Sequence, residues 1–171
     1  MKSMNFIVEI IPKPRENDRV INLLNLHWGS AKVVSRGKIT DASKISRIMV
    51  KNENDELIGL ATFKINKRDG SCELISINAE EKGKGIGTKL IKTLEKIAKE
   101  KGVKRIWLIT TNDNYDAAIF YIKNGYRLVN VHKNALDVSR QLKPQIPKIG
   151  KYGIPMNDEW EFEKLFDQPP E

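Results

Sequence analysis

The residues with the clearest chemical potential lie in a glycine-rich segment near the middle of the chain. This segment spans Lys82–Thr88 and reads KGKGIGT, between an expected strand and an expected helix. Three glycines at alternate positions let the backbone approach a ligand closely, so that several N–H groups converge on one concavity. The first turn of the helix adds unpaired N–H donors and the positive end of its dipole. The segment therefore predicts a phosphate or pyrophosphate site, although a plain strand-to-helix turn fits the same residues.

Two common phosphate loops do not match these residues. The P-loop needs a glycine followed after four residues by Gly-Lys-Ser or Gly-Lys-Thr, and the chain contains no such string. The dinucleotide-binding fingerprint needs Gly-x-Gly-x-x-Gly, whereas the glycines here are Gly83, Gly85 and Gly87. The next expected strand, Arg105–Thr110, also lacks an acidic residue to bind a ribose. Both classes are excluded.

Hydrophobic periodicity and turn residues predict the elements that position this segment. From residue 72 onward the expected order is strand, helix, strand, helix, strand, preceded by an antiparallel meander. This order favours an α/β (α+β) fold with a mixed sheet and helices on both faces. The expected strands are Phe6–Ile11, Ile45–Val50, Leu57–Ile65, Cys72–Asn78, Arg105–Thr110, Tyr126–Val131 and Glu159–Glu163, the last paired with Tyr126–Val131. Helices are expected at 20–28, 89–101, 117–122 and, as a short one, 135–142.

Length and composition limit the class of protein. The 171 residues predict about one domain, and 30 Lys+Arg against 22 Asp+Glu give a net charge of +8. No stretch approaches the roughly 18 apolar residues of a membrane span, and the first residues do not read as a signal peptide. The single cysteine, Cys72, excludes an intrachain disulfide framework and a multi-cysteine zinc site. We expect a cytoplasmic protein without a metal.

The positive charge alone leaves three explanations open, namely nucleic-acid binding, attraction to a small polyanion, or solubility. A lysine-rich helix over 89–101 would suit a nucleic acid, but Glu95 and Glu100 dilute its charge. No known nucleic-acid-binding motif is present, so a basic nucleic-acid-binding domain is kept as the weaker alternative.

Two segments in the right order resemble the markers of one enzyme family. The pattern Lys82-x-x-Gly85-x-Gly87 resembles the Gln/Arg-x-x-Gly-x-Gly/Ala signature of the GNAT superfamily of acetyl-CoA-dependent N-acyltransferases. Residues Ala117–Tyr126, AAIFYIKNGY, resemble its second marker, A-x-x-F-Y-x-x-x-G-F/Y, and Leu108–Asn114 resembles its splayed strand and loop. The resemblance covers 6–131 and extends to bacterial members of unassigned substrate. Lys82 departs from the signature, and only three residues, 79–81, separate it from the expected strand Cys72–Asn78.

The resemblance implies a mostly antiparallel sheet of about seven strands. It places the family core at residues 1–132. Residues 133–171 are then a C-terminal extension with a proline-rich loop and the final strand, within the same single domain. It also implies an N-acetyltransferase that moves acetyl from acetyl-CoA to a primary amine by direct attack. An acyl-CoA-binding sensor without turnover is the alternative within the same fold.

By the same resemblance, coenzyme A contacts the fourth strand, the glycine-rich segment and the start of a later helix. The strand would bind the thioester carbonyl and the pantetheine arm, and the segment would bind the pyrophosphate. The predicted cofactor residues are Ser76, Ile77, Asn78, Lys82, Gly83, Lys84, Gly85, Ile86, Gly87, Thr88, Asn112, Asn114 and Tyr121.

Two side chains are the candidates for proton transfer. Tyr121 occupies the family position whose hydroxyl protonates the leaving thiolate, and core packing is its other explanation. Glu73 lies where several relatives carry a glutamate that accepts the amine proton. Alternation along the strand would place Glu73, Ile75 and Ile77 on one face, where partial burial would raise the pKa of the carboxyl. No covalent intermediate is required, so Cys72 is expected to be a core residue.

The acceptor side is the least determined part of the site. Trp28 and Arg36 occupy the region that shapes the acceptor pocket in the family, and an arginine there suits a substrate carboxylate. A core tryptophan and a surface loop are the plainer explanations. His132 lies near the acceptor or is merely exposed. The acceptor is a small molecule or a peptide amine, a homodimer is left open, and no membrane partner is expected.

Overall fold

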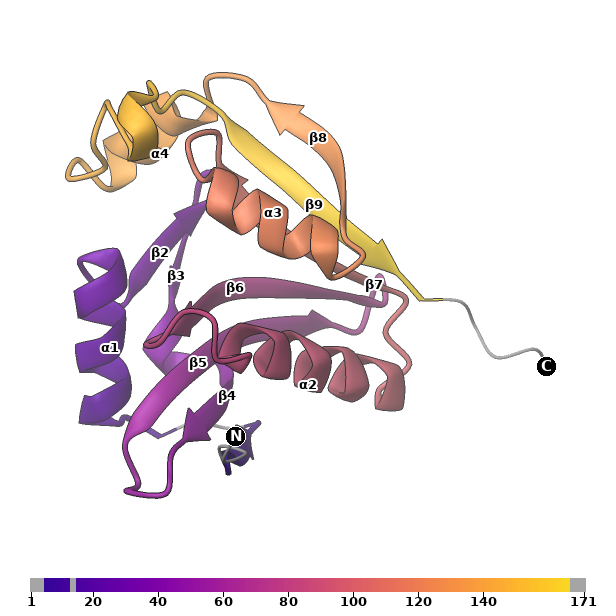
Figure 1. Ribbon diagram of the computed structural model, residues 1–171. Coiled ribbons are helices and arrows are strands. Elements are labelled where there is room, and N and C mark those ends of the chain that lie inside the picture. Colours follow the sequence, from indigo (N-terminus) through magenta and orange to yellow (C-terminus); the bar gives the residue numbers. More distant parts are fainter. Residues whose placement is uncertain (1–4, 13–14, 167–171) are drawn as a thin grey trace.

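The computed structural model describes residues 5–12 and 15–166, which form a seven-stranded sheet with helices on both faces (Figure 1). The strand order is β1-β4-β5-β6-β7-β9-β8. Strands β6 and β7 are parallel, and every other neighbouring pair is antiparallel. The strands are β1 Ile7–Ile11, β4 Ser46–Lys51, β5 Leu57–Asn66, β6 Ser71–Ala79, β7 Arg105–Thr111, β8 Arg127–His132 and β9 Glu159–Leu165. The predicted mixed, mostly antiparallel sheet is confirmed.

Helices α2 (Ile86–Glu100) and α3 (Tyr115–Lys123) cover one face of the sheet. The buried side of α2 carries Leu90, Ile91 and Leu94, which pack with β4–β7 in the larger of two cores. The lysines between them remain in solvent, as the 3.6-residue period requires. Gly102 follows the helix at φ 69°, a conformation that glycine adopts without strain.

The opposite face is covered by α1 (Asp18–Trp28) and by a small hairpin of β2 (Lys32–Ser35) and β3 (Lys38–Asp41). Asn17 caps α1 through its side-chain oxygen, and Val20, Leu23 and Leu24 bury the inner stripe of the helix in the second core. Short 3₁₀ turns stand at Ala42–Lys44 (η1) and Lys151–Gly153 (η2). This hairpin was not among the expected strands, because each of its strands is only four residues long.

The C-terminal segment completes the sheet instead of lying beside it. After α4 (Ala135–Leu142) the chain returns as β9, which is inserted between β7 and β8. The predicted pairing of β9 with β8 and the predicted helix at α4 are both confirmed. The pairing of β9 with β7 was not foreseen, and it runs from Thr111–Glu159 to Arg105–Leu165.

Cys72 is fully buried in the larger core, as expected for a packing residue. Burial raises the pKa of its thiol to about 12, so a nucleophilic thiolate is disfavoured.

Among the described residues, no helix is long and apolar enough to cross a membrane.

Candidate active site

A break in the sheet between β6 and β7 is the central feature of the site. The two strands pair only over Ser71–Leu74 and Arg105–Leu108, and beyond these residues they separate. The register of β6 against β5 slips at the same point, so that Ile75 is an extra residue in β6. Such a bulge bends its strand and increases the local twist. The far half of β6 therefore keeps β5 on one edge and leaves its other edge open toward β7.

The bulge overturns the alternation expected for β6. Ile75 packs in the core under α1, whereas Ile77 packs against the core under α2, so these side chains lie on opposite faces. Cys72 and Leu74 face α2, which leaves Glu73 on the face toward α1, with Ile75. Thus the expected shared face of Glu73, Ile75 and Ile77 is wrong, because one extra residue reverses the order of faces.

The glycine-rich segment stands at the open end of this break and fits a phosphate group. Gly83 and Gly85 both have φ 77°, and a Cβ on either would meet no atom within 4 Å. Gly85 is the N-cap of α2 with no side-chain hydrogen bond at the cap, and the first intrahelical bond is donated by Lys89. The N–H groups of Ile86, Gly87 and Thr88 consequently lack helical acceptors, and they are free to donate to an anion.

Residues of β6 that were predicted to contact the cofactor line the opened half of the strand. Ser76 is buried and its hydroxyl lies 2.6 Å from that of Thr62. The Asn78 side chain accepts a hydrogen bond of 2.7 Å from the Trp28 indole at the end of α1. Ile77, next to them, presents its side chain to the other face. Trp28 is thus placed directly over the predicted cofactor strand.

Tyr121 lies in α3 on the α2 face of the sheet. Its ring is buried and packs on Phe120, Tyr126 and Phe162, with ring centroids 5.3–5.9 Å away. Burial raises the pKa of the phenol, so the hydroxyl keeps its proton throughout the neutral range. Tyr121 is therefore a neutral phenol whose hydroxyl can donate a proton.

Glu73 lies on the opposite face, in a half-buried position next to β7. Burial raises the pKa of its carboxyl, and Glu159 and Glu161 raise it further, while Lys64 and Lys38 act against them. Lys64 is the cross-strand partner of Glu73 on β5. A carboxylate with a raised pKa is a better proton acceptor near neutral pH than an exposed one.

A row of glutamates on β9 continues this polar face. Arg105 donates to Glu163 and, at 2.6 Å, to Glu161, which also lies 3.0 Å from Nε2 of His132. Burial raises the pKa of Glu161, but the hydrogen bonds from His132 and Arg105 outweigh this effect and hold the pKa below its ordinary value. The strict alternation of Glu159, Glu161 and Glu163 predicts a strand, and the same alternation places all three carboxyl groups on one face of it.

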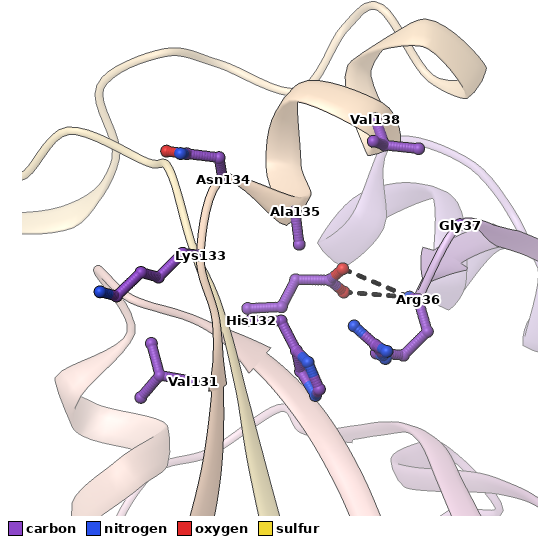
Figure 2. Close-up of a pocket in the computed structure, with 9 residues that line it drawn as sticks. Arg36, Gly37, Val131, His132, Lys133, Asn134, Ala135 and Val138 are labelled. Carbon is purple, nitrogen blue, oxygen red and sulfur yellow. Dashed lines mark hydrogen bonds between the residues drawn. The ribbon is translucent and has the colours of Figure 1, made fainter.

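A cavity of about 610 Å³ opens above the row, between the β2–β3 turn and the start of α4 (Figure 2). Arg36 and Gly37 from the turn and His132 from β8 line it, together with Val138. Glu159 also lines it and is 1% exposed, and its carboxylate accepts from the Arg36 backbone N–H at 3.2–3.3 Å (dashed lines in Figure 2). Burial raises the pKa of Glu159. Arg36 and His132 are thus brought into one cavity, whereas Trp28 lies outside its lining.

Two predicted cofactor residues at the start of α3 are engaged within the protein. Asn114 caps α3 by accepting from Ala117 N, and it also accepts from Lys151 Nζ at 3.2 Å. The Asn112 amide donates to Pro155 O, and its oxygen accepts from two backbone N–H groups near the start of β9. Their roles in cofactor binding stay predictions.

Comparisons with known proteins agree with this geometry. Residues 17–126 match the model of the acetyltransferase (GNAT) family. The uncharacterised protein YdhI of Bacillus subtilis strain 168 is 40% identical over 141 residues, which are 82% of this chain and 87% of that protein. In fold the chain is similar to an IAA acetyltransferase from Bacillus cereus ATCC 14579, with a TM-score of 0.71, 21% identity and coverage of 95% of this chain and 100% of the other. It is also similar to a Bacillus subtilis acetyltransferase in complex with CoA, with a TM-score of 0.68, 17% identity and coverage of 95% and 99%.

The fit of the glycine-rich segment to a phosphate group, the broken sheet and the match over 110 residues lead to one assignment. The chain belongs to the acetyltransferase (GNAT) family and is an acyltransferase that uses acetyl-CoA.

Proposed function

We propose that this acyltransferase acetylates a primary amine by direct attack of the amine, without a covalent enzyme intermediate. The break between β6 and β7 supports the proposal, because it connects the two faces of the sheet and each face carries different functional groups. The α2 face carries the glycine-rich segment and Tyr121, and the α1 face carries Glu73 and the cavity beside β9. An acetyl donor bound on the first face and an amine acceptor bound on the second would meet in the break.

Each face supplies one proton transfer. Bound acetyl-CoA supplies a thioester and a leaving thiolate. Glu73, whose pKa is raised, accepts the proton of the incoming ammonium group at its carboxylate. Tyr121, which stays protonated, donates its phenolic proton to the departing sulfur. The backbone edge of β6 beyond Ile75 is open to hydrogen-bond the carbonyl oxygen, which is the usual way to stabilise the developing negative charge.

Replacement of Glu73 by glutamine tests the role of the base. The rate at neutral pH should fall about tenfold, which is modest for a general base because part of the amine deprotonates in solvent. A base acts when it is deprotonated, so the wild-type rate should rise with pH through the raised pKa of Glu73. In E73Q that rise should shift to the pKa of the free amine. A kcat/KM profile measured against pH checks this, and an unchanged profile in E73Q removes Glu73 from the mechanism.

Arg36 is proposed to bind a carboxylate on the acceptor. Arg36 and Gly37 form a two-residue turn with φ 51° and 71°, the geometry that asparagine followed by glycine adopts best. R36N should therefore keep or raise the unfolding temperature while it removes the guanidinium group. KM should rise about tenfold for amines that bear a carboxylate, as expected for a charge-assisted hydrogen bond. Uncharged amines serve as the control, and an equal change for both classes would exclude Arg36 as the carboxylate ligand.

Calorimetry with acetyl-CoA, followed by an assay of thiol release with a panel of amines, tests the function as a whole. Binding together with amine-dependent release supports the enzyme. Binding without release from any amine supports the sensor, and binding of DNA or RNA in place of acetyl-CoA supports the nucleic-acid alternative. A cytoplasmic location belongs to the proposal on the grounds of sequence alone, and no sequence pattern specifies a homodimer.

A further inference from the structure

The C-terminal loop, residues 150–154, is a tight turn fixed against the corner between β7 and α3. Gly150 N donates to Ile154 O at 2.8 Å, and Ile149 pairs with Pro155 on either side of the loop. A Cβ on Gly150 would lie 2.1 Å from Oδ2 of Asp113, so the loop touches the corner without room for a side chain. This loop belongs to the part of the chain beyond the two family markers.

The polar residues of the corner hold the loop through several independent bonds. The Asp113 carboxylate accepts from Lys151 N at 2.8 Å, and Lys151 Nζ donates to the Asn114 side chain at 3.2 Å. Asn112 binds the following backbone at Pro155 with its amide group. These contacts fix the position of the loop relative to α3.

At the tip of the loop, Tyr152 is both strained and exposed. Its φ of 58° and ψ of 19° lie in the left-handed region, which a tyrosine rarely adopts and which glycine or asparagine would adopt at lower cost. Its side chain is nevertheless 69% exposed, while its hydroxyl donates to Oδ1 of Asp116 at 2.6 Å. The hydrogen bond to Asp116 thus anchors an exposed aromatic ring at a strained position of the backbone.

The ring is held beside the glycine-rich segment. Asp116 and Phe120 are four residues apart in α3 and so lie on the same side of the helix. Phe120 contacts the first turn of α2, because a Cβ on Gly87 would lie 3.2 Å from its ring. Asp116, with Tyr152 bound to it, is thus one helical turn farther toward the edge at which both helices begin. The hydrogen bond from Tyr152 lowers the pKa of Asp116 most, burial raises it by less, and the nearby charges of Lys151 and Lys82 lower it further.

We propose that Tyr152 stacks on the adenine ring of coenzyme A. A pyrophosphate bound at Lys82–Thr88 leaves the adenosine half outside the break in the sheet, where exposed side chains are its available partners. Tyr152 is a flat, exposed ring fixed beside that segment, and aromatic side chains bind nucleobases by stacking. The pantetheine half of the cofactor contains no flat ring on which Tyr152 could stack. This inference rests on the coenzyme A site at the glycine-rich segment and is independent of the acceptor.

Two donors and three variants test the proposal by calorimetry. The donors are acetyl-CoA and S-acetyl-4′-phosphopantetheine, which lacks the adenosine half. Y152A should raise the Kd of acetyl-CoA about tenfold, or about 1.4 kcal/mol. It should leave the Kd of the truncated donor within about twofold. Y152F keeps the ring and loses only the hydrogen bond to Asp116, so it should weaken acetyl-CoA much less than Y152A does. Y115A, which removes another exposed tyrosine of α3, should bind both donors like the wild type.

The outcomes separate this proposal from the assignment on which it rests. Equal losses for both donors in Y152A, or no loss, would overturn the stacking role. If Y152F weakens acetyl-CoA as much as Y152A does, the hydroxyl acts by anchoring the loop, and stacking is again excluded. A wild-type protein that binds neither donor would refute the coenzyme A site itself. Thermal unfolding of each variant establishes that the fold is retained.

Discussion

Replacement of Gly85 by aspartate is expected to weaken acetyl-CoA binding at least 100-fold, or by about 2.7 kcal/mol. The added carboxylate would stand in the open space around Gly85, next to the unpaired N–H groups at the start of α2. Two like charges about 4 Å apart repel by about 4 kcal/mol at an effective dielectric constant near 20, which exceeds the expected loss. Calorimetry with acetyl-CoA measures the effect.

Asparagine at the same position is the matched control. It has nearly the size of aspartate and tolerates the left-handed conformation at φ 77°, but it carries no charge. G85N should therefore bind acetyl-CoA much more tightly than G85D. Both residues favour the start of a helix, so neither variant should lose α2. If G85D binds acetyl-CoA as the wild type does, the glycine-rich segment is not the phosphate site.

Replacement of Tyr121 by phenylalanine is expected to lower kcat about 100-fold, the lower part of the range for a lost general acid. The buried phenol is protonated in the wild type and offers its proton to the leaving sulfur, whereas phenylalanine cannot. The ring contacts with Phe120 and Phe162 remain, so the Kd of acetyl-CoA should stay within about twofold of the wild type. Single-turnover kinetics separates the chemical step from product release.

Tyr126 provides the control for Tyr121. It is 2% exposed, packs on Tyr121 with ring centroids 5.9 Å apart, and its buried hydroxyl has no hydrogen-bond partner among the described residues. Y126F removes a hydroxyl from the same core without touching the proposed chemistry, so kcat should not change, and stability should hold or rise. Equal rates in Y121F and the wild type would show that solvent, and not Tyr121, protonates the thiolate.

The helices, the central strands and the glycine-rich turn before α2 could be predicted because local patterns specify them. The β6 bulge could not, since Ile75 is an ordinary strand residue and the extra position appears only in the register of β6 against β5. That single residue decides which side chains share a face with Glu73. The cavity could not be predicted either, because it is lined by Arg36 and Glu159, which are 123 positions apart in the chain.

The C-terminal loop shows a second limit of sequence patterns. Its glycines and prolines predicted an irregular segment correctly, but nothing in them indicated that Asn112, Asp113 and Asn114 would hold it. Asn114 also caps α3 by accepting from Ala117 N, a role for which asparagine is favoured at the start of a helix. The additional contacts arise because β9 returns beside β7, which brings residues of 150–158 to the start of α3.

The amount of acetylated amine formed per thiol released from acetyl-CoA tests the central claim most directly. With the wild-type protein and a panel of primary amines, the account predicts one acetylated amine for each thiol, with release that depends on the amine and is lost in G85D. Mass spectrometry of the amine and a thiol assay of the same samples give both quantities. Thiol release without acetylated amine, or no release with any amine by a protein that binds acetyl-CoA, would contradict acetyl transfer to an amine.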